Sequence, residues 1–446
     1  MMNGIWVAMI IGALICGALT GQLNEVALAS TKSAGDAVEL AIGLVGVMAL
    51  FLGLMQVIQR GGLLRSVTRV LRPVLVWLFP GVPPDHPAMG MMILNMTSNM
   101  LGLANAATPF GIKAIIELNK LNKQKGTASD SMALFLAINT SNLALIPSGV
   151  IGLRASLGAS APGSIFFTTL VATSVSTIVA IIAAKSLQRL PVFAAPKDLG
   201  KDAAVAVVDD ATKAPDTSEV EVAIDGDGTR ASPFASVIGW VLLIAVVAAF
   251  AYAFAARSEV IENGEAVGIF GSFKTAVSQW PLLFIIGGIL LYGVLRGVQV
   301  YDVVVEGGRE GFQIALRIIP YLVAILAAVG MLRASGGLDL MVDLISPVTN
   351  LIGMPAETLP MALLRPLSGS GAYGVAAEAM KAHGPDSLIG QIVSTMQGST
   401  ETTFYVLAVY FGAVGVHRVR HTLAACLAAD VAGAVASVWA CRLMLG

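Results

Sequence analysis

The sequence predicts an all-α polytopic membrane protein, built from two inverted-topology repeats with broken or re-entrant helices. Three observations support this fold class. Hydrophobic residues make up 56% of the 446-residue chain, charged residues make up only 12%, and the mean hydropathy is +0.81. Several runs of about 20 apolar residues follow one another, which is typical of membrane-spanning helices. The same order of apolar, glycine-containing and polar segments occurs twice along the chain.

Nine segments are apolar enough to be candidate spans. The first contains "IWVAMIIGALICGALTG", and no Lys or Arg occurs before Lys32. A secretion signal would begin with a basic region, so we predict an uncleaved first helix. The candidate spans are residues 5–21, 38–58, 131–152, 163–185, 235–256, 279–296, 313–332, 387–411 and 422–443.

Two further apolar stretches, 88–106 and 357–378, are rich in Gly, Ser, Asn and Pro. "MILNMTSNMLGLANAATPFG" and "LPMALLRPLSGSGAYGVAAEA" are poor candidates for straight helices, so we predict broken or re-entrant segments. Such backbone is tolerated at membrane depth only where protein or a wet cavity covers it. The prediction is therefore about 9 spans plus 2 re-entrant segments.

Residues 186–233 differ from the rest of the chain, because they are rich in Pro, Ala, Asp and Lys. This composition predicts a flexible linker between two halves. The predicted domains are an N-terminal helix (1–37), a first repeat (38–185), the linker (186–233), connecting helices (234–312) and a second repeat (313–446).

The Lys and Arg residues beside the spans favour one orientation under the positive-inside rule. Arg60, Arg65, Arg69 and Arg72 follow the second span, Lys185 and Arg189 follow the fourth, and Arg418 and Arg420 lie between the last two. Placing them inside predicts that the N-terminus and the linker are cytoplasmic and that the C-terminus lies outside. Arg154, Arg257 and Arg333 are then isolated exceptions on the outer side.

The two halves share sequence markers. Gly61-Gly62 are expected to correspond to Gly336-Gly337, Pro73 to Pro347, and Asn139–Asn142 to Gly398–Glu401. The segment after the first Gly-Gly pair is basic, with Arg65, Arg69 and Arg72, whereas the segment after the second carries Asp339 and Asp343. A basic helix inside and an acidic helix outside are expected of an inverted repeat. Inverted repeats with broken helices that meet near the midplane are a hallmark of secondary transporters.

Four polar clusters lie at the predicted membrane depth: "NMTSN", "NTSN", "SGSG" and "QGSTET". Consecutive polar residues cannot all face one side of a helix, so we expect the helices to be unwound or cut there. The alternative is ordinary packing between membrane helices, whose interfaces also contain small and hydroxyl residues. The candidate solute-binding residues are Asn95, Thr97, Ser98, Asn99, Asn139, Thr140, Ser141, Asn142, Ser368, Ser370, Gln397, Ser399, Thr400 and Glu401.

Glu401 is the charged member of these clusters. A carboxylate at span depth is functional by default, and it could bind a cation, a proton or a donor group of the solute. The rival interpretation is a structural ion pair with Arg365, which lies in the broken segment of the same half.

Other reactive residues predict little chemistry. Cys16, Cys426 and Cys441 have no paired spacing, and His417 and His421 lie in a basic turn, so we expect no metal site and no cofactor. No catalytic constellation occurs, so we expect no enzyme. The net charge of −1 gives no indication of a nucleic-acid partner. The expected partners are a small polar solute, with a coupling cation left open, and the lipid bilayer; a homo-oligomer is also left open.

Several motifs resemble a known family. "NMTSNMLGLANAATPFGIKAIIELNKLN" and "LAINTSNLALIPSGVIGLR" resemble spore maturation protein A, and "LLRPLSGSGAYG", "IVSTMQGSTETTFYVLAVYFGAVGV" and "RHTLAACLAADV" resemble spore maturation protein B. The resemblance covers about 38–185 and 313–446, so the chain looks like a fusion of the two. It implies a nucleoside-recognition or gate domain, of the kind also described in concentrative nucleoside transporters and ferrous iron transport protein B. It further implies a multi-pass protein of the bacterial inner (plasma) membrane.

The sequence therefore predicts a transporter-like protein that moves a small polar solute, nucleoside-like or another metabolite, by alternating access at the repeat interface. The alternative is a non-transporting membrane factor that supports envelope or spore-maturation-like processes, with the linker as its partner-binding arm.

Overall fold

The computed structural model describes residues 2–445 except 103, 142, 194–232, 259, 263–264, 267, 270–271, 274–275 and 277–279. Within these residues the regular secondary structure is helical apart from one pair of two-residue strands, β1 (Ile261–Glu262) and β2 (Glu265–Ala266), and a single bridge between Thr127 and Arg418. The all-α prediction is thus confirmed. Candidate residue Asn142 and most of the predicted linker lie outside the described residues.

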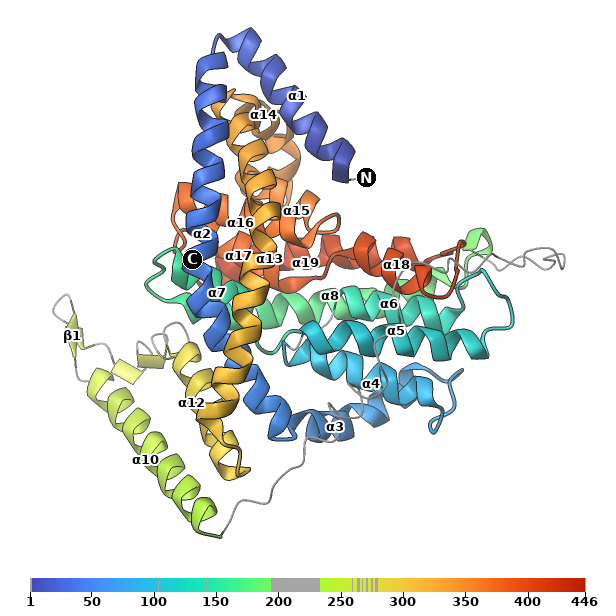
Figure 1. Cartoon of the computed structure of the whole chain (residues 1–446), viewed down its shortest axis with the longest axis vertical. Coiled ribbons are helices and arrows are strands. Elements are labelled where there is room, and N and C mark those ends of the chain that lie inside the picture. Colours follow the sequence, from blue (N-terminus) through green and yellow to red (C-terminus); the bar gives the residue numbers. More distant parts are fainter. Residues whose placement is uncertain are drawn as a thin grey trace.

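The helices form two series with the same order (Figure 1). After α1 (Met2–Thr20), the first series is α2 (Leu23–Arg60), α3 (Leu63–Leu78), α4 (Pro87–Met100), α5 (Ala104–Leu121), α6 (Asp130–Thr140), α7 (Ser148–Ser156) and α8 (Ile165–Leu187). The second is α13 (Val300–Ala334), α14 (Gly337–Leu351), α15 (Leu359–Leu364), α16 (Gly369–His383), α17 (Leu388–Ser399), α18 (Thr403–Gly412) and α19 (Thr422–Met444).

The remaining elements lie between or beside these series. Helices α10 (Pro233–Ser258) and α12 (Pro281–Leu295) pack on each other and connect the two halves. The described part of the chain also contains three short 3-10 turns, η1 (Pro162–Ser164), η2 (Pro191–Phe193) and η3 (Ala356–Thr358).

Matching glycines start the second helix of each series. Gly62 has φ 77° directly before α3, and Gly336 has φ 73° directly before α14. Glycine adopts this left-handed conformation without the penalty that a Cβ imposes. Gly62 therefore corresponds to Gly336, one residue from the predicted pairing of Gly61-Gly62 with Gly336-Gly337. In this register Pro73 and Pro347 fall at equivalent positions of their helices.

The first helix of each series begins earlier than hydropathy indicated. The predicted boundaries at residues 38 and 313 lie inside α2 and α13, which start at Leu23 and Val300. The added turns carry charged residues that hydropathy excludes from a span. In the structure these charges form ion pairs, such as Lys381 with Asp36 at 2.6 Å and Arg60 with Glu306 at 2.7 Å.

Helices α2 and α13 pack along one another in opposite directions (Figure 1). Gly53 lies against Val304, Gly311 against Ala49, and Gly330 against Ser33. The backbones approach so closely that a Cβ on Gly311 would lie 2.6 Å from the Cα of Ala49. Small residues permit such contacts, which are common between membrane helices.

The last helices of the two series, α8 and α19, are also antiparallel. Ser176 in the middle of α8 donates to the carbonyl of Ala429, at 2.8 Å. Near the start of α8, the hydroxyl of Thr168 lies 2.9 Å from that of Thr395, which in turn lies 3.2 Å from the sulfur of Cys441 near the end of α19. The matching first and last helices of the two series therefore pair head to tail.

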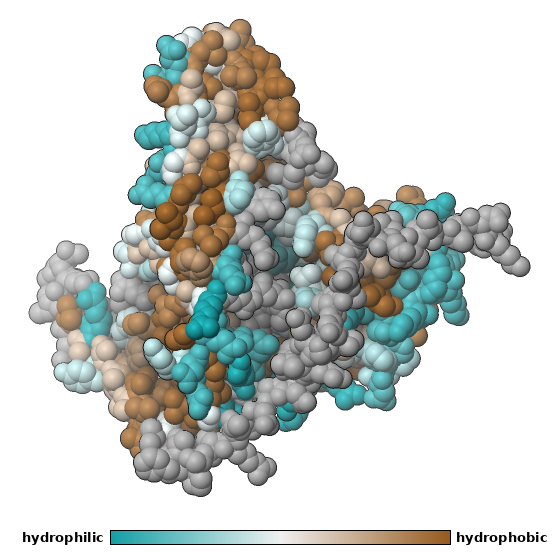
Figure 2. Space-filling model, in the orientation of Figure 1, coloured by the Kyte–Doolittle hydropathy of each residue, from teal (hydrophilic) through white to brown (hydrophobic). Residues whose placement is uncertain are grey.

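Four apolar segments of the described chain have the length and composition of a membrane span: Leu23–Arg60, Pro162–Leu187, Gly239–Ser258 and Thr422–Met444. The predicted spans 131–152 and 387–411 are each divided into two short helices, α6–α7 and α17–α18. Apolar side chains such as Ile15, Leu19 and Leu28 are exposed on α1 and α2, and Figure 2 shows apolar surface at this end of the molecule. Such surface is typical of contact with lipid. The count of nine spans stays a prediction.

Candidate functional site

The first helix break lies between α6 and α7. Helix α6 ends at Thr140, Ser141 caps it, and α7 begins at Ser148 after Pro147. The hydroxyls of Ser141 and Thr140 both donate to the carbonyl of Ala137, at 2.7 and 3.1 Å. These bonds give the last turn local hydrogen-bond partners, and the proline disfavours continuation of the helix.

The second break has the same plan. Helix α17 ends at Ser399, and Thr400 is extended, with φ −142° and ψ 162°, before α18 begins at Thr403. The Ser399 hydroxyl donates to the carbonyl of Met396 at 2.9 Å. Ser399 and Thr400 thus occupy the positions of Thr140 and Ser141. The predicted helix cuts at "NTSN" and "QGSTET" are confirmed.

The two breaks touch each other. The backbone N–H of Glu401 donates to the carbonyl of Thr140 at 2.7 Å, which joins the halves through main-chain atoms. Close by, a Cβ on Gly398 would lie 3.5 Å from Pro147 and 2.9 Å from the methyl group of Thr169. Broken segments that are far apart in sequence therefore meet at one place.

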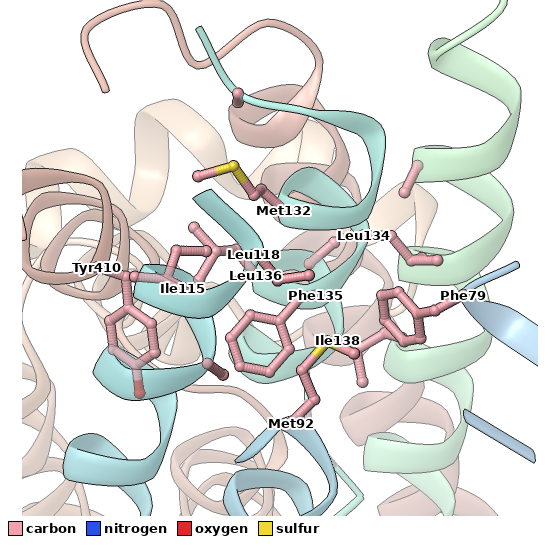
Figure 3. Packing of buried hydrophobic residues seen from close by; sticks show 14 of the residues in the cluster. Phe79, Met92, Ile115, Leu118, Met132, Leu134, Phe135, Leu136, Ile138 and Tyr410 are labelled. Carbon is pink, nitrogen blue, oxygen red and sulfur yellow. The ribbon is translucent and has the colours of Figure 1, made fainter. Parts of the chain in front are cut away.

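A buried amide network holds the first break against its neighbours. Asn139 donates from Nδ2 to Oδ1 of Asn95 at 2.7 Å, and Asn95 donates from Nδ2 to the carbonyl of Ala107 at 2.7 Å. The hydroxyl of Tyr410, a residue that sequence reasoning missed, lies 3.4 Å from both amide nitrogens. Its ring packs beside Phe135, with centroids 6.4 Å apart (Figure 3). Asn95 and Asn139 therefore have mutual partners in this structure.

The predicted unwinding of "NMTSN" is wrong. Asn95 to Asn99 lie within α4, and the chain turns only afterwards, at Leu101 and at Gly102 with φ 74°. The helix does not need to break, because protein covers its polar side chains. Asn95, Thr97 and Ser98 are buried, and Asn99 is half-buried. The Thr97 hydroxyl lies 3.5 Å from that of Thr68.

The "SGSG" cluster forms the turn between α15 and α16. Ser368 caps α16, because its hydroxyl accepts from the backbone N–H of Gly371 at 3.0 Å. Ser370 lies in the first turn of α16 and is half-buried. The hydroxyl of Ser368 is thus committed to the helix start, whereas Ser370 is only partly covered.

Arg365 holds the second break in its extended form. Its guanidinium donates from Nη2 to the carbonyl of Thr400 and from Nη1 to the hydroxyl of Thr402, the latter at 3.2 Å. Its distance to the Oε2 of Glu401 is 3.8 Å, so the predicted ion pair is long. The Glu401 side chain is 46% exposed, which corrects the expectation of a buried carboxylate. Gln397 is half-buried, and its Oε1 lacks a hydrogen-bond partner among the described residues.

The buried carboxylate belongs to Asp430, which sequence reasoning missed. It lies in α19, is only 7% exposed, and accepts from the hydroxyl of Thr403 at 2.7 Å. The signal was available, since Asp430 is the one acidic residue of the predicted span 422–443. In the described residues no group of three or more His, Cys, Asp and Glu side chains could hold a metal ion.

Two arginines fasten the halves together at opposite ends of α8. We call them the arginine anchors, Arg154 and Arg420. Arg154 is fully buried, and it donates to the carbonyl of Pro385 at 2.5 Å and to Asp386 at 2.9 Å. Partial burial alone would raise the pKa of Asp386, but the Ser160 amide and the Arg154 guanidinium outweigh it and lower that pKa.

Arg420 makes the equivalent contacts at the other end. It donates to Asp130 at 2.7 Å, to the carbonyl of Ala128 at 3.1 Å, and to the carbonyl of Phe193 at 2.8 Å. Arg154 lies near the end of α7 and Arg420 follows α18, and each binds residues at the start of the broken helix of the other half. Because α8 has 23 residues, the anchors lie at the ends of a helix that is about 35 Å long.

Comparisons with known proteins agree with this two-part organisation. A family model described as Gate, nucleoside recognition, matches residues 41–187 and 315–416. Spore maturation protein B of Bacillus subtilis (strain 168) is 51% identical over 162 residues, which are 36% of this chain and 91% of that protein. Spore maturation protein A of the same organism is 43% identical over 182 residues, which are 41% of this chain and 93% of that protein. No solved structure matches.

Proposed function

Because the chain belongs to the family described as Gate, nucleoside recognition, we propose that this membrane protein transports a small polar solute between its two halves. The observation that carries the proposal is the meeting of the two helix breaks through the Glu401–Thr140 backbone bond. In many secondary transporters, the substrate site is formed where interrupted helices from two repeats meet in this way.

The polar groups around the breaks that are partly covered or lack a partner define the side chains that would bind the solute. Glu401 and Ser370 are partly covered, Asn99 is half-buried at the end of α4, and Gln397 has a buried Oε1 with no hydrogen-bond partner among the described residues. Asn95 and Asn139 already bond each other, so we assign them to positioning the first break rather than to direct contact. This set offers several neutral hydrogen-bonding groups and one carboxylate, which suits a polar solute that is neutral or carries a donor group.

Alternating access is supported by the head-to-tail pairing of the two series. Antiparallel α2 and α13, and antiparallel α8 and α19, are expected if the repeats have inverted topology. The arginine anchors would then lie on opposite sides of the membrane, Arg420 on the cytoplasmic side and Arg154 on the outer side. Release of one anchor while the other holds would open the site to one side only. We place the protein in the bacterial inner membrane, with its N-terminus in the cytoplasm.

A ligand screen tests this proposal on the purified full-length chain. Nucleosides, sugars and amino acids are added separately, and a bound solute should raise the melting temperature through mass action. Candidates are then tested for uptake into proteoliposomes. Glu401→Gln is expected to weaken solute binding tenfold or more, because a hydrogen bond to a charged group contributes about 1.5–3 kcal/mol.

Glu357→Gln is the matched control, since Glu357 is an exposed carboxylate of the same half, on η3 away from the break. It should bind and transport the solute as the unmodified chain does. If Glu401→Gln also bound and transported normally, the assignment of Glu401 to the solute would be wrong. If no solute in the screen were bound or taken up, the proposed class of small polar solutes would be refuted.

A second candidate function follows from the names of both relatives, which are spore maturation proteins. The chain would then be a membrane factor that supports envelope processes without transport, and the segment 195–230 would bind its partner. Shortening 195–230 separates the two proposals. A transporter should keep solute uptake, whereas a factor should lose its cellular role. In both proposals the protein is not an enzyme.

A further inference from the structure

One face of α19 lies against both helix breaks. Cys426, Asp430 and Gly433 are spaced four and three residues apart, so they share a side of this helix. Cys426 contacts Thr140 at the first break, and Asp430 accepts from Thr403 just after the second. A Cβ on Gly433 would lie 2.9 Å from the methyl group of Thr400. The carboxylate of Asp430 is therefore placed where the two halves meet.

Only one of the two oxygens of Asp430 is satisfied. Oδ2 accepts from the Thr403 hydroxyl, whereas Oδ1 is buried and has no hydrogen-bond partner among the described residues. The charged and titratable groups that interact with Asp430 are Arg365 from the second half and Cys426 from α19 itself. Glu401 interacts in turn with Arg365. Arg365 donates to Thr400 and Thr402, so it acts on Asp430 through its charge.

We propose that Asp430 binds and releases a proton, and that this proton is the coupling ion of the transport proposed above. A buried carboxylate oxygen without a donor is costly when charged, and a proton on Oδ1 removes that cost. Oδ2 can keep its bond from Thr403 in both states. The proton comes from water and returns to water, and no other bond forms or breaks.

A metal cation fits this position less well. Hard cations take about six or more oxygen ligands. Around Asp430 the described contacts supply its own carboxylate and the hydroxyl of Thr403, and the guanidinium of Arg365 lies nearby. A proton needs only the one free oxygen, and the positive charge of Arg365 opposes a second cation.

Coupling follows from the position of Arg365 between two carboxylates. When Asp430 is charged, Arg365 is attracted by both Asp430 and Glu401. When Asp430 carries a proton, Glu401 is left as the charged partner, and the attraction between Arg365 and Glu401 competes directly with a solute at Glu401. Proton binding to Asp430 on α19 would in this way lower the affinity of the site for its solute.

Infrared difference spectroscopy of the purified full-length chain, between alkaline and acidic buffer, tests the proton site without any solute. The unmodified protein should show the C=O stretch of a protonated, water-shielded carboxyl group, and Asp430→Asn should lack it. Glu401→Gln should retain this band, as should Asp85→Asn, whose side chain is 94% exposed. Persistence of the band in Asp430→Asn would overturn the proposal, as would its absence from the unmodified protein.

A second variant keeps the test decisive if Asp430→Asn does not fold. Thr403→Val preserves the shape of the side chain but removes the hydroxyl that donates to Asp430. The band should remain and move in frequency, and an unmoved band would refute the assignment. Failure of the proton site can be distinguished from failure of the proposed transport. If the unmodified protein transports a solute but lacks this band, only the proton site is refuted. If it shows the band but transports no solute, only the proposed transport is refuted.

Discussion

Replacement of Arg154 by Met should destabilise the protein more than any other single change at the anchors. Arg154 is fully buried, and it donates to Asp386 and to the carbonyls of Pro385, Pro162 and Ala161. Without the guanidinium these acceptors lose their donor. A hydrogen bond to a charged group contributes about 1.5–3 kcal/mol, and water replaces part of this at Asp386, whose side chain is 41% exposed. We expect a strongly reduced melting temperature in detergent and a shorter half-life of the folded protein.

Two further variants test whether the loss of stability in Arg154→Met comes from losing the planar set of guanidinium donors. Arg154→Lys keeps the charge but presents fewer donors in a different geometry, so it should remain clearly destabilised. Arg60→Met removes an exposed ion pair with Glu306, whose side chains are 48% and 55% exposed, and should change stability by about 1 kcal/mol or less. Equal melting of Arg154→Met and Arg60→Met would contradict the role of Arg154 as an anchor.

The second large effect is expected at the contact of α2 with α13. In Gly311→Ala the new methyl group would lie 2.6–2.7 Å from backbone atoms of Ala49 and 2.7 Å from the carbonyl oxygen of Met48. Backbone atoms cannot rotate away as a flexible side chain can, so the helices must separate. Overpacking of this kind typically costs about 1–3 kcal/mol, occasionally more. The melting temperature should fall, and the two long helices should lose their tight contact.

Gly308→Ala is the control on the same helix, one turn away. Its methyl group would lie 3.6 Å from the carbonyl oxygen of Ala49, which is an ordinary contact. Alanine favours helix over glycine by about 1 kcal/mol, so this variant should be neutral or slightly stabilised. A fall in melting temperature as large as that of Gly311→Ala would show that the close approach is not the cause.

The sequence predicted the breaks in α6–α7 and α17–α18 because runs of polar residues inside apolar segments are a local signal. The same rule was wrong for Asn95 to Asn99, since neighbouring helices and Tyr410 cover those side chains and no local pattern reports that cover. The starts of α2 and α13 were missed for a related reason. Their charged turns look unsuitable for a helix in lipid until the partners across the interface are known.

The burial and the partners of the charged residues in the site were harder to predict from the sequence than the positions of the helices. Glu401 and Asp430 are both acids within apolar segments, and their sequence surroundings do not say which one is buried. Packing of α19 against the breaks decides it, with Asp430 enclosed and Glu401 partly exposed. Arg154 was predicted only as an isolated charge on the outer side, and Arg420 only as one of the basic residues between the last two spans. Their acceptors in the other half lie hundreds of residues away in the sequence.

The bond between Glu401 and Thr140 has a consequence for how the protein is assembled. Each half contributes one side of the site, so a half alone would leave the Thr140 carbonyl and the Glu401 amide without each other. Two halves made as separate chains would have to be produced in equal amounts and then associate in the bilayer. In a single polypeptide the two halves are made in a one-to-one ratio. Covalent linkage also makes their association intramolecular, and for short flexible tethers the effective concentration is about 1 mM or more. The fused chain thus fixes the stoichiometry of its own interface at synthesis.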